Sequence, residues 1–317
     1  MGDSGMRQAG APEAGARWRI YWRRIVVALV GLLGVTVVAY FGVCGYVATQ
    51  LTKPDRHDQV ATPADYGLAF EETVVTARDG LQLAAWFVPY TGSERAVLVV
   101  HGKSKCRSCE FDDRFMEFAA RLRAGGFNLL MIDLRGHGQS EGKRFTLGDH
   151  ERRDVLGALD WLVERGFKRI GIVGVSLGAV SSVGAASDPD SGHLVKALVI
   201  DSSFSDLAEL LRVRFTKESG LPGVFFPGSL FMARALVGTN PYAVNPVEDL
   251  PRVGAPVMVI YGGQDHIVPL DQLQAMADVR PDAETWFVAD AAHARIYNAR
   301  PEQYVSRITQ FLDEVLR

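Results

Sequence analysis

A serine between two glycines follows an apolar run in the middle of the chain. Gly174 and Gly178 flank Ser176 with the spacing G-x-S-x-G, and residues 169–173 before them read as a buried strand. Where a strand turns sharply into a helix, the chain folds back so closely that only glycine fits on either side of the serine. The pattern therefore predicts that Ser176 projects from the turn as a nucleophile.

A serine hydroxyl attacks a carbonyl carbon only when a base accepts its proton and a carboxylate orients that base. In chains with this turn, the acid and then the histidine follow the serine. His293, just after the last strand pattern, is the predicted base, in preference to His266. Asp265, on the loop after the penultimate strand, is the predicted acid, with Asp201 as the first alternative and Asp290 as the second.

Two backbone N–H groups are needed to stabilise the charge that develops on the substrate carbonyl oxygen. We expect one from Leu177, directly after the turn, and the other from the loop after His101. In that loop the N–H of Lys103 is predicted, with that of Ser104 as the alternative, whereas His101 itself is expected to shape the loop. The side chains of Lys103 and Lys105 fit solvated charges better than contacts to an anionic substrate.

Cys106 and Cys109 follow this loop with the spacing C-x-x-C. A redox motif of this spacing belongs to a different fold, and a zinc site needs two further ligands nearby, which the sequence does not offer. The pair forms either a local disulfide, in an oxidising compartment, or two free thiols. Three cysteines in all exclude a disulfide scaffold, and the sequence implies no metal and no organic cofactor.

Strand and helix patterns alternate from about residue 66 onward. Asp79-Gly80 lies between two β-rich runs and predicts a hairpin. The alternation that follows predicts an α/β fold with a mainly parallel sheet and helices on both faces. The strands, beginning with that hairpin, are expected at 72–77, 81–89, 96–100, 127–132, 169–173, 197–200, 256–261 and 285–289, and the helices at 111–124, 149–165, 180–186 and 301–316.

The N-terminal region contains a long apolar segment. Residues 25–47 carry no charged side chain and are long enough to cross a bilayer core, which takes about 20 residues. Arginines precede this segment, so the positive-inside bias predicts a cytoplasmic tail at 1–24 and an extracytoplasmic C-terminal part. A signal peptide cleaved after Cys44 is the alternative, and it would give a secreted protein. The arginines are Arg17, Arg19, Arg23 and Arg24.

Residues 48–65 contain two prolines and are expected to be a linker to a globular domain at 66–317. The formal net charge is −3, and no basic stripe runs along the chain. Nucleic acid is therefore excluded as a partner. The sequence leaves the oligomeric state open.

From about residue 71 to the C-terminus the chain resembles an α/β hydrolase. The resemblance rests on Val100-His101-Gly102, on the segment 133–140 with the pattern D-x-R-G-x-G-x-S, on the G-x-S-x-G turn and on the acid and base loops. It implies the α/β-hydrolase fold, with Asp133, Arg135 and His137 as structural parts of the site wall. Within the superfamily, the membrane segment and the strand at 86–89 are similar to the Bem46-like and serine-aminopeptidase-like hydrolases.

Residues 204–250 interrupt the strand-helix alternation and, in this superfamily, resemble a cap over the active site. The segment is markedly apolar and includes Phe225, Phe226, Phe231 and Met232. Either these four side chains line a pocket for a small-molecule or lipid acyl substrate, or they pack the cap onto the domain.

These residues together predict a membrane-anchored serine hydrolase that cleaves ester or thioester bonds, with amide bonds as the alternative, through an acyl-enzyme on Ser176. An esterase, lipase or thioesterase is favoured over a peptidase. Two alternatives remain. One is an acyltransferase that uses the same Ser176, Asp265 and His293, and the other is a non-catalytic binding protein on a hydrolase fold.

Overall fold

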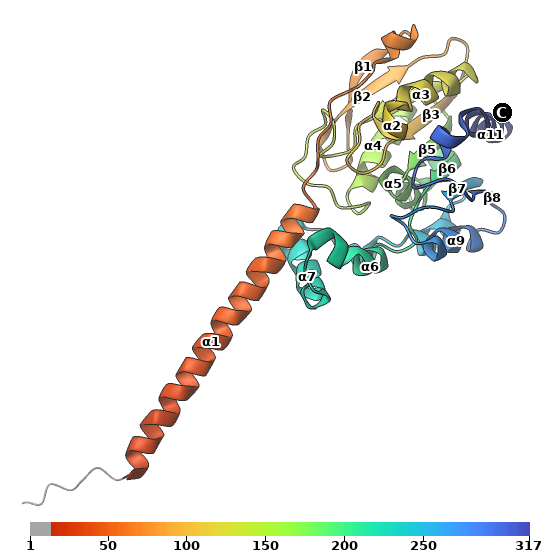
Figure 1. Ribbon diagram of the computed structural model, residues 1–317. Coiled ribbons are helices and arrows are strands. Elements are labelled where there is room, and N and C mark those ends of the chain that lie inside the picture. The colour runs from red at the N-terminus through yellow and green to blue at the C-terminus, as the bar shows by residue number, and fades with distance from the viewer. Residues whose placement is uncertain (1–13) are drawn as a thin grey trace, which may run out of the picture.

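The computed structural model describes residues 14–317 and consists of a globular part and one long N-terminal helix (Figure 1). Eight strands form a single sheet in the order β1-β2-β4-β3-β5-β6-β7-β8. The pairs β1–β2 and β2–β4 are antiparallel and the other five are parallel, so the predicted α/β fold and opening hairpin are confirmed. The strands are β1 (Glu71–Thr76), β2 (Gln82–Val88), β3 (Arg95–Val100), β4 (Asn128–Ile132), β5 (Arg169–Val175), β6 (Val195–Asp201), β7 (Val257–Gly262) and β8 (Glu284–Val288).

Helices cover both faces of the sheet. In chain order the α-helices of the described residues are α1 (Ala14–Leu51), α2 (Glu110–Asp113), α3 (Phe115–Ala124), α4 (Glu151–Glu164), α5 (Leu177–Ala186), α6 (Leu207–Ser219), α7 (Phe226–Val237), α8 (Pro246–Asp249), α9 (Leu270–Asp278), α10 (Ile296–Ala299) and α11 (Pro301–Val315). Successive strand residues point to opposite faces. In β3, Leu98 and Val100 therefore join a core with α4 and α5, whereas Val97 and Val99 join a core with α3 and α11.

Outside α1 and the segment predicted as a cap, the helices differ from the sequence prediction in three places, one of which is the unpredicted four-residue helix α10. The helix predicted at 111–124 is broken into α2 and α3, because Phe111, Asp112 and Asp113 have positive φ angles of 57°, 54° and 65°. The helix α9 was not predicted, since this short segment buries only two apolar side chains, Leu273 and Met276, and gives little periodic signal.

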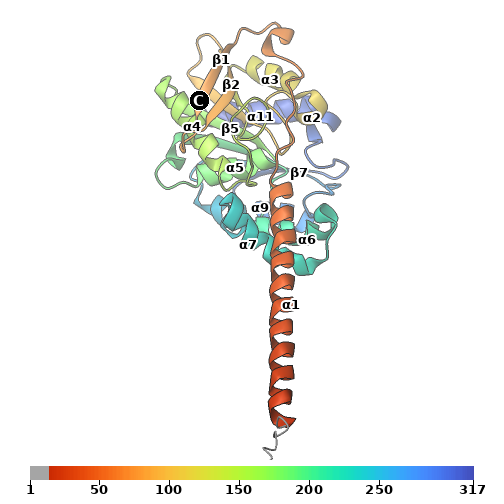
Figure 2. The same ribbon diagram turned by 90° about the vertical axis from the view of Figure 1, so that its left-hand side faces the viewer.

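The insertion between β6 and β7 is helical and contains α6, α7 and α8. In Figure 1, α6 and α7 lie beside the upper end of α1, on the side of the sheet where β6 and β7 are. The second view places α7 and α6 on the two sides of α1 (Figure 2). The segment predicted as a cap therefore lies where the globular part meets the N-terminal helix.

The helix α1 extends beyond the apolar segment of the sequence at both ends. Its portion Arg17–Leu51 is long and apolar enough to cross a membrane, and a signal sequence near the N-terminus has the same character. Cys44, Val47 and Ala48 near its end are buried. Residues 48–51, predicted as linker, are therefore helical because this last turn packs against the cap. Residues 1–13 of the predicted tail lie outside the described residues.

The rest of the predicted linker is held against the globular part. The Arg56 guanidinium donates hydrogen bonds to the carbonyls of Gly138, Ser140 and Gly142 at 2.7–2.8 Å. The Gln59 amide donates to Asp133 at 3.0 Å. The segment thus fixes the end of α1 to the loop that follows β4.

Candidate active site

The serine turn has the strained backbone that its flanking glycines predict. Ser176 has φ 52° and ψ −112° between β5 and α5, and its N–H donates to the Asp201 carbonyl at 2.8 Å. A side chain at Gly178 would lie 2.4 Å from the Val100 carbonyl oxygen, and one at Gly174 would lie 2.6 Å from the carbonyl oxygen of Gly178. Both glycines are therefore required by the close approach of the chain to itself.

The structure brings the three predicted catalytic side chains together. His293 Nε2 lies 2.9 Å from Ser176 Oγ, and His293 Nδ1 lies 2.6 Å from Asp265 Oδ2. The other oxygen of Asp265 accepts the backbone N–H groups of Ile267 and Val268, each at 2.8 Å. With Nδ1–H donating to the carboxylate, Nε2 is the acceptor for the serine hydroxyl. This arrangement allows His293 to accept the proton of Ser176 as the hydroxyl attacks.

The alternative acids and base lie elsewhere. Asp201 is fully buried, and it accepts hydrogen bonds from Ser202 Oγ and Tyr304 Oη at 2.9 Å each. Burial raises the pKa of Asp201 to about 6. Asp290 forms an exposed ion pair with Arg300 at 2.8 Å. His266 is exposed.

Asp201 supports the histidine loop without touching His293. Ser202 Oγ, which donates to the Asp201 carboxylate, accepts the backbone N–H of Ala294 at 3.0 Å. Ala294 follows His293 and has a positive φ of 52°. The buried carboxyl therefore holds the backbone beside the predicted base, a role that the sequence reasoning missed.

The loop after β3 is fixed by buried polar groups. His101 Nε2 accepts the Leu134 N–H at 3.0 Å, and its Nδ1–H donates to the Gly102 carbonyl at 2.7 Å. Burial lowers the pKa of His101 to about 3, so the ring is neutral and shapes the loop as predicted. The Gly102 N–H donates to Glu110 Oε2 at 2.7 Å. The N–H groups of Lys103 and Leu177 thus remain the candidates for the oxyanion, and both residues line the cavity at Ser176.

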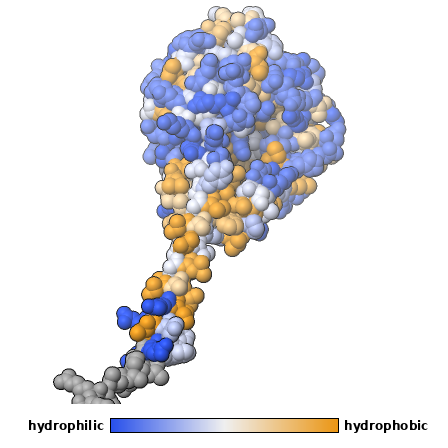
Figure 3. All heavy atoms as spheres, turned by 60° about the vertical axis from the view of Figure 1, so that its left-hand side comes forward, coloured by the Kyte–Doolittle hydropathy of each residue, from blue (hydrophilic) through white to orange (hydrophobic). Residues whose placement is uncertain are grey.

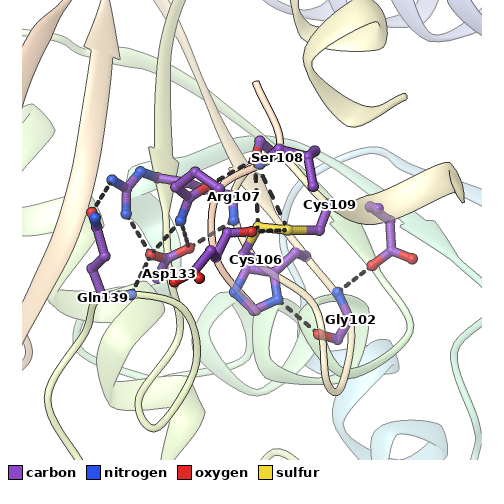
Figure 4. The surroundings of a disulfide bond; sticks show 12 residues. Gly102, Cys106, Arg107, Ser108, Cys109, Asp133 and Gln139 are labelled. Atoms are coloured by element: carbon purple, nitrogen blue, oxygen red, sulfur yellow. Dashed lines mark hydrogen bonds and ion pairs between the residues drawn. A yellow bond between two sulfur atoms is a disulfide. The ribbon is translucent and has the colours of Figure 1, made fainter. Parts of the chain in front are cut away.

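A disulfide between Cys106 and Cys109 closes the turn between this loop and Glu110, which resolves the two possibilities left by the sequence (Figure 4). Between the cysteines, the Arg107 guanidinium forms a buried ion pair with Asp133 and stacks 4.2 Å from the centre of the Trp86 ring. Burial raises the pKa of the Glu110 carboxyl, against the effect of its hydrogen bond from Gly102. Sequence reasoning missed Arg107 and Glu110, although both are charged residues within or directly after the C-x-x-C pattern.

The segment 133–140 is a structural part of the site, as the resemblance implies. Asp133 accepts the backbone N–H groups of Arg107 and Gln139 at 2.7 and 2.9 Å. Arg135 forms ion pairs with Asp79 and Asp154 at 2.8 and 2.6 Å. His137 Nδ1 lies 2.9 Å from the Arg135 carbonyl oxygen. These contacts hold the loop that faces His101.

A cavity of about 460 Å³ extends from Ser176 and His293 beneath the cap. This volume falls within the range of small-molecule sites, about 300–1,000 Å³. Phe226 lines it, but Phe225, Phe231 and Met232 do not. The prediction that all four side chains line the pocket is therefore wrong, because successive residues of a helix face different directions and only one face of α7 borders the cavity.

The sheet order, the serine turn after β5 and the histidine loop after β8 define an α/β hydrolase. The chain belongs to this family, since the model of the alpha/beta hydrolase family matches residues 97–307. The protein Rv2307c of Mycobacterium tuberculosis is 34% identical over 206 residues, 63% of this chain and 64% of the relative. The chain thus spans a little less than two thirds of that relative's length.

Two further proteins are similar over more of the chain. YqkD of Bacillus subtilis is 23% identical over 310 residues, 92% of this chain and 98% of YqkD. Among solved structures, the esterase Pf2001 of Pyrococcus furiosus superposes with a TM-score of 0.68 and 27% sequence identity, over 84% of this chain and 98% of the esterase.

Proposed function

We propose that this hydrolase cleaves ester or thioester bonds through an acyl-enzyme on Ser176. The observation that carries the proposal is the unbroken series of contacts from Ser176 Oγ to His293 at 2.9 Å and from His293 to Asp265 at 2.6 Å. Both distances lie within the reach needed for proton transfer and for orientation of the base. The similarity to an esterase of known structure supports the same class of reaction.

Acylation begins with attack of Ser176 Oγ on the carbonyl carbon of the substrate. The hydroxyl proton moves to His293 Nε2, and the carbonyl electron pair moves onto the oxygen to form a tetrahedral oxyanion. The N–H groups of Leu177 and Lys103 stabilise this oxyanion. The intermediate then collapses, and His293 returns the proton to the departing alkoxide or thiolate.

Deacylation repeats the sequence with water as the nucleophile. His293 removes a proton from water as its oxygen attacks the acyl carbon, and the second tetrahedral intermediate expels Ser176 Oγ, which takes the proton back. The products are a carboxylic acid and the regenerated serine. Asp265 orients His293 in both halves of the reaction and stabilises the imidazolium that forms.

The same proposal places the hydrolase domain outside the cytoplasm, anchored by α1. Arg17, Arg19, Arg23 and Arg24 precede the apolar segment, and the positive-inside bias leaves this end in the cytoplasm. The Cys106–Cys109 disulfide supports this orientation, because disulfides persist in oxidising compartments. Oxidation of the pair in membranes isolated with a thiol-blocking reagent present tests the location.

Hydrolysis of p-nitrophenyl butyrate by the purified full chain tests the reaction. Ser176→Ala and His293→Ala are expected to lower kcat/KM by at least about 10⁴-fold, because the loss of either residue abolishes the acyl-enzyme route. Ser182→Ala is the matched control, since its hydroxyl only donates within α5 to the Gly178 carbonyl at 2.6 Å. Equal hydrolysis by Ser176→Ala and the wild type would contradict the proposal.

A further inference from the structure

The N-terminal helix packs closely against the cap through small residues. A side chain added at Gly228 of α7 would lie 2.5 Å from Cys44 Sγ and 2.6 Å from the Tyr40 ring. Likewise, one added at Gly45 of α1 would lie 3.1 Å from the end of Met232. The Tyr40 hydroxyl also donates to the Val224 carbonyl at 2.8 Å. Small residues on both helices therefore allow their backbones to approach, as in packed helices of membrane proteins.

The end of α1 also forms part of the cavity wall. Ala48 and Leu51 of this helix, and Thr52 directly after it, line the same cavity as Ser176 and His293. The opposite walls come from apolar residues of α6 and α7, which include Leu207, Leu211, Phe215, Phe226 and Leu230. Polar residues also line the cavity, among them Lys103 beside the serine turn and Arg214 and Glu218 of α6. The helix that would anchor the chain is thus also a component of its substrate pocket.

The cap lies level with the C-terminal end of the apolar segment of α1. Counted from Ile25, a hydrocarbon layer of about 30 Å at about 1.5 Å per residue ends near residue 45. Tyr40 stacks on Phe225 with ring centres 5.3 Å apart, and Phe41 lies 5.6 Å from Phe231. Both cap residues are therefore level with helix residues that lie within the hydrocarbon layer when α1 spans a bilayer.

The surface of the cap beside α1 carries apolar side chains that are exposed. Val224 is 68% exposed, Phe231 61% and Leu236 56%. Figure 3 shows hydrophobic surface continuing from the helix onto the lower edge of the globular part. Apolar side chains gathered at this level match a lipid surface, because their transfer from water into the bilayer is favourable.

We infer that the cap enters the outer leaflet and that the cavity, completed by α1, receives the acyl chain of a membrane lipid ester directly from the bilayer. This inference rests on the proposed function and specifies its substrate class. The acyl chain lies between α1, α6 and α7, and its ester carbonyl reaches Ser176. A long-chain substrate thereby passes from lipid to an apolar pocket without crossing water.

Two variants test the inference with the full chain in phosphatidylcholine vesicles. The rate is measured with p-nitrophenyl palmitate in the bilayer and with p-nitrophenyl butyrate in solution. Ala48→Phe fills the cavity at its α1 wall, and it is expected to lower the palmitate-to-butyrate ratio at least tenfold. Ala39→Phe is the matched control, because Ala39 is exposed on the same helix, and its ratio should equal that of the wild type.

Val224→Asp tests entry of the cap into the leaflet. A carboxylate at this exposed position opposes burial in lipid, and the palmitate-to-butyrate ratio should fall by about tenfold or more. The control is Val74→Asp, since Val74 is 56% exposed on β1, far from the cap. Unchanged ratios in both test variants would overturn the inference while the proposed function stands. If the wild type cleaves neither ester, the proposed function itself fails and the inference fails with it.

Discussion

Replacement of Gly178 by alanine tests whether the serine turn and the loop after β3 form one catalytic unit. The added Cβ would lie 2.4 Å from the Val100 carbonyl oxygen and 2.6 Å from that of His101, whereas Cβ atoms do not approach other atoms within 3.0 Å. The start of α5 and the end of β3 must therefore separate by at least 0.6 Å, from 2.4 to 3.0 Å. These two segments carry the N–H groups of Leu177 and Lys103.

The expected loss follows from that displacement. Donors to an oxyanion act at about 2.7–3.1 Å, so a shift of this size takes at least one N–H out of range. The loss of one such donor costs about 10²–10³-fold in kcat, and strain in the packed core adds about 1–3 kcal/mol of destabilisation. Hydrolysis of p-nitrophenyl butyrate, measured well below the melting temperature of the variant, should thus fall at least about 10²-fold.

The matched control is Gly184→Ala on the same helix. Its added Cβ would meet only the Arg152 side chain at 3.4 Å, an ordinary contact, so activity should equal that of the wild type. A folded Gly178→Ala variant with wild-type kcat/KM would refute the reasoning, because the two segments could then separate without effect on catalysis.

Three further changes probe the supports of the site. Replacement of both Cys106 and Cys109 by alanine opens the turn before Glu110. The free energy of unfolding should fall by about 2 kcal/mol, and kcat/KM should fall with it. Equal melting temperatures of the variant and the wild type would show that the disulfide does not support the site. Burial raises the pKa of Asp201 to about 6, above the value of about 4 expected in the unfolded chain. The protonated carboxyl therefore stabilises the fold fully below about pH 4, and this stabilisation is lost as the pH rises through about 6. The free energy of unfolding of Asp201→Asn, measured by denaturant titration, should therefore rise by up to about 3 kcal/mol relative to that of the wild type between pH 4 and 7. A difference that does not change with pH would show that the protonation of Asp201 is not coupled to folding. Gly228→Val should lower the melting temperature, because the added side chain forces α1 away from α7. The control is Gly223→Ala, whose added Cβ has no atom within 4 Å, and its melting temperature should equal that of the wild type. A larger loss in Gly223→Ala than in Gly228→Val would contradict the close packing of α1 on α7.

The sheet and the three side chains of the candidate catalytic site were predictable because their signals are local. Buried parallel strands read as continuous apolar runs, and G-x-S-x-G specifies a turn whose geometry only glycine tolerates. The order of strands then fixes which loops meet at their carboxyl ends, which identified His293 and Asp265. The structure brings Asp265 into contact with His293, and His293 into contact with Ser176.

The supports of the site were not predictable in the same way, because they depend on contacts between distant segments. Glu110 accepts the Gly102 N–H across the turn that the Cys106–Cys109 disulfide closes, and the chain then bends through three residues of positive φ, Phe111 to Asp113. The Asp201 carboxyl supports Ala294 through Ser202, 92 positions away in the chain from Ala294, and it also accepts a hydrogen bond from Tyr304, which lies 103 positions from Asp201. An apolar cap sequence likewise gives no indication of which side chains face the cavity and which face α1.

Labelling with a fluorophosphonate, followed by mass spectrometry of the peptides, tests the central claim most directly. The reagent phosphonylates a serine only when a base activates its hydroxyl. We predict one adduct on the peptide that contains Ser176, absent from Ser176→Ala and strongly reduced in His293→Ala. A folded wild-type chain that remains unlabelled at Ser176, or that is labelled equally in His293→Ala, would contradict the proposed role of this serine.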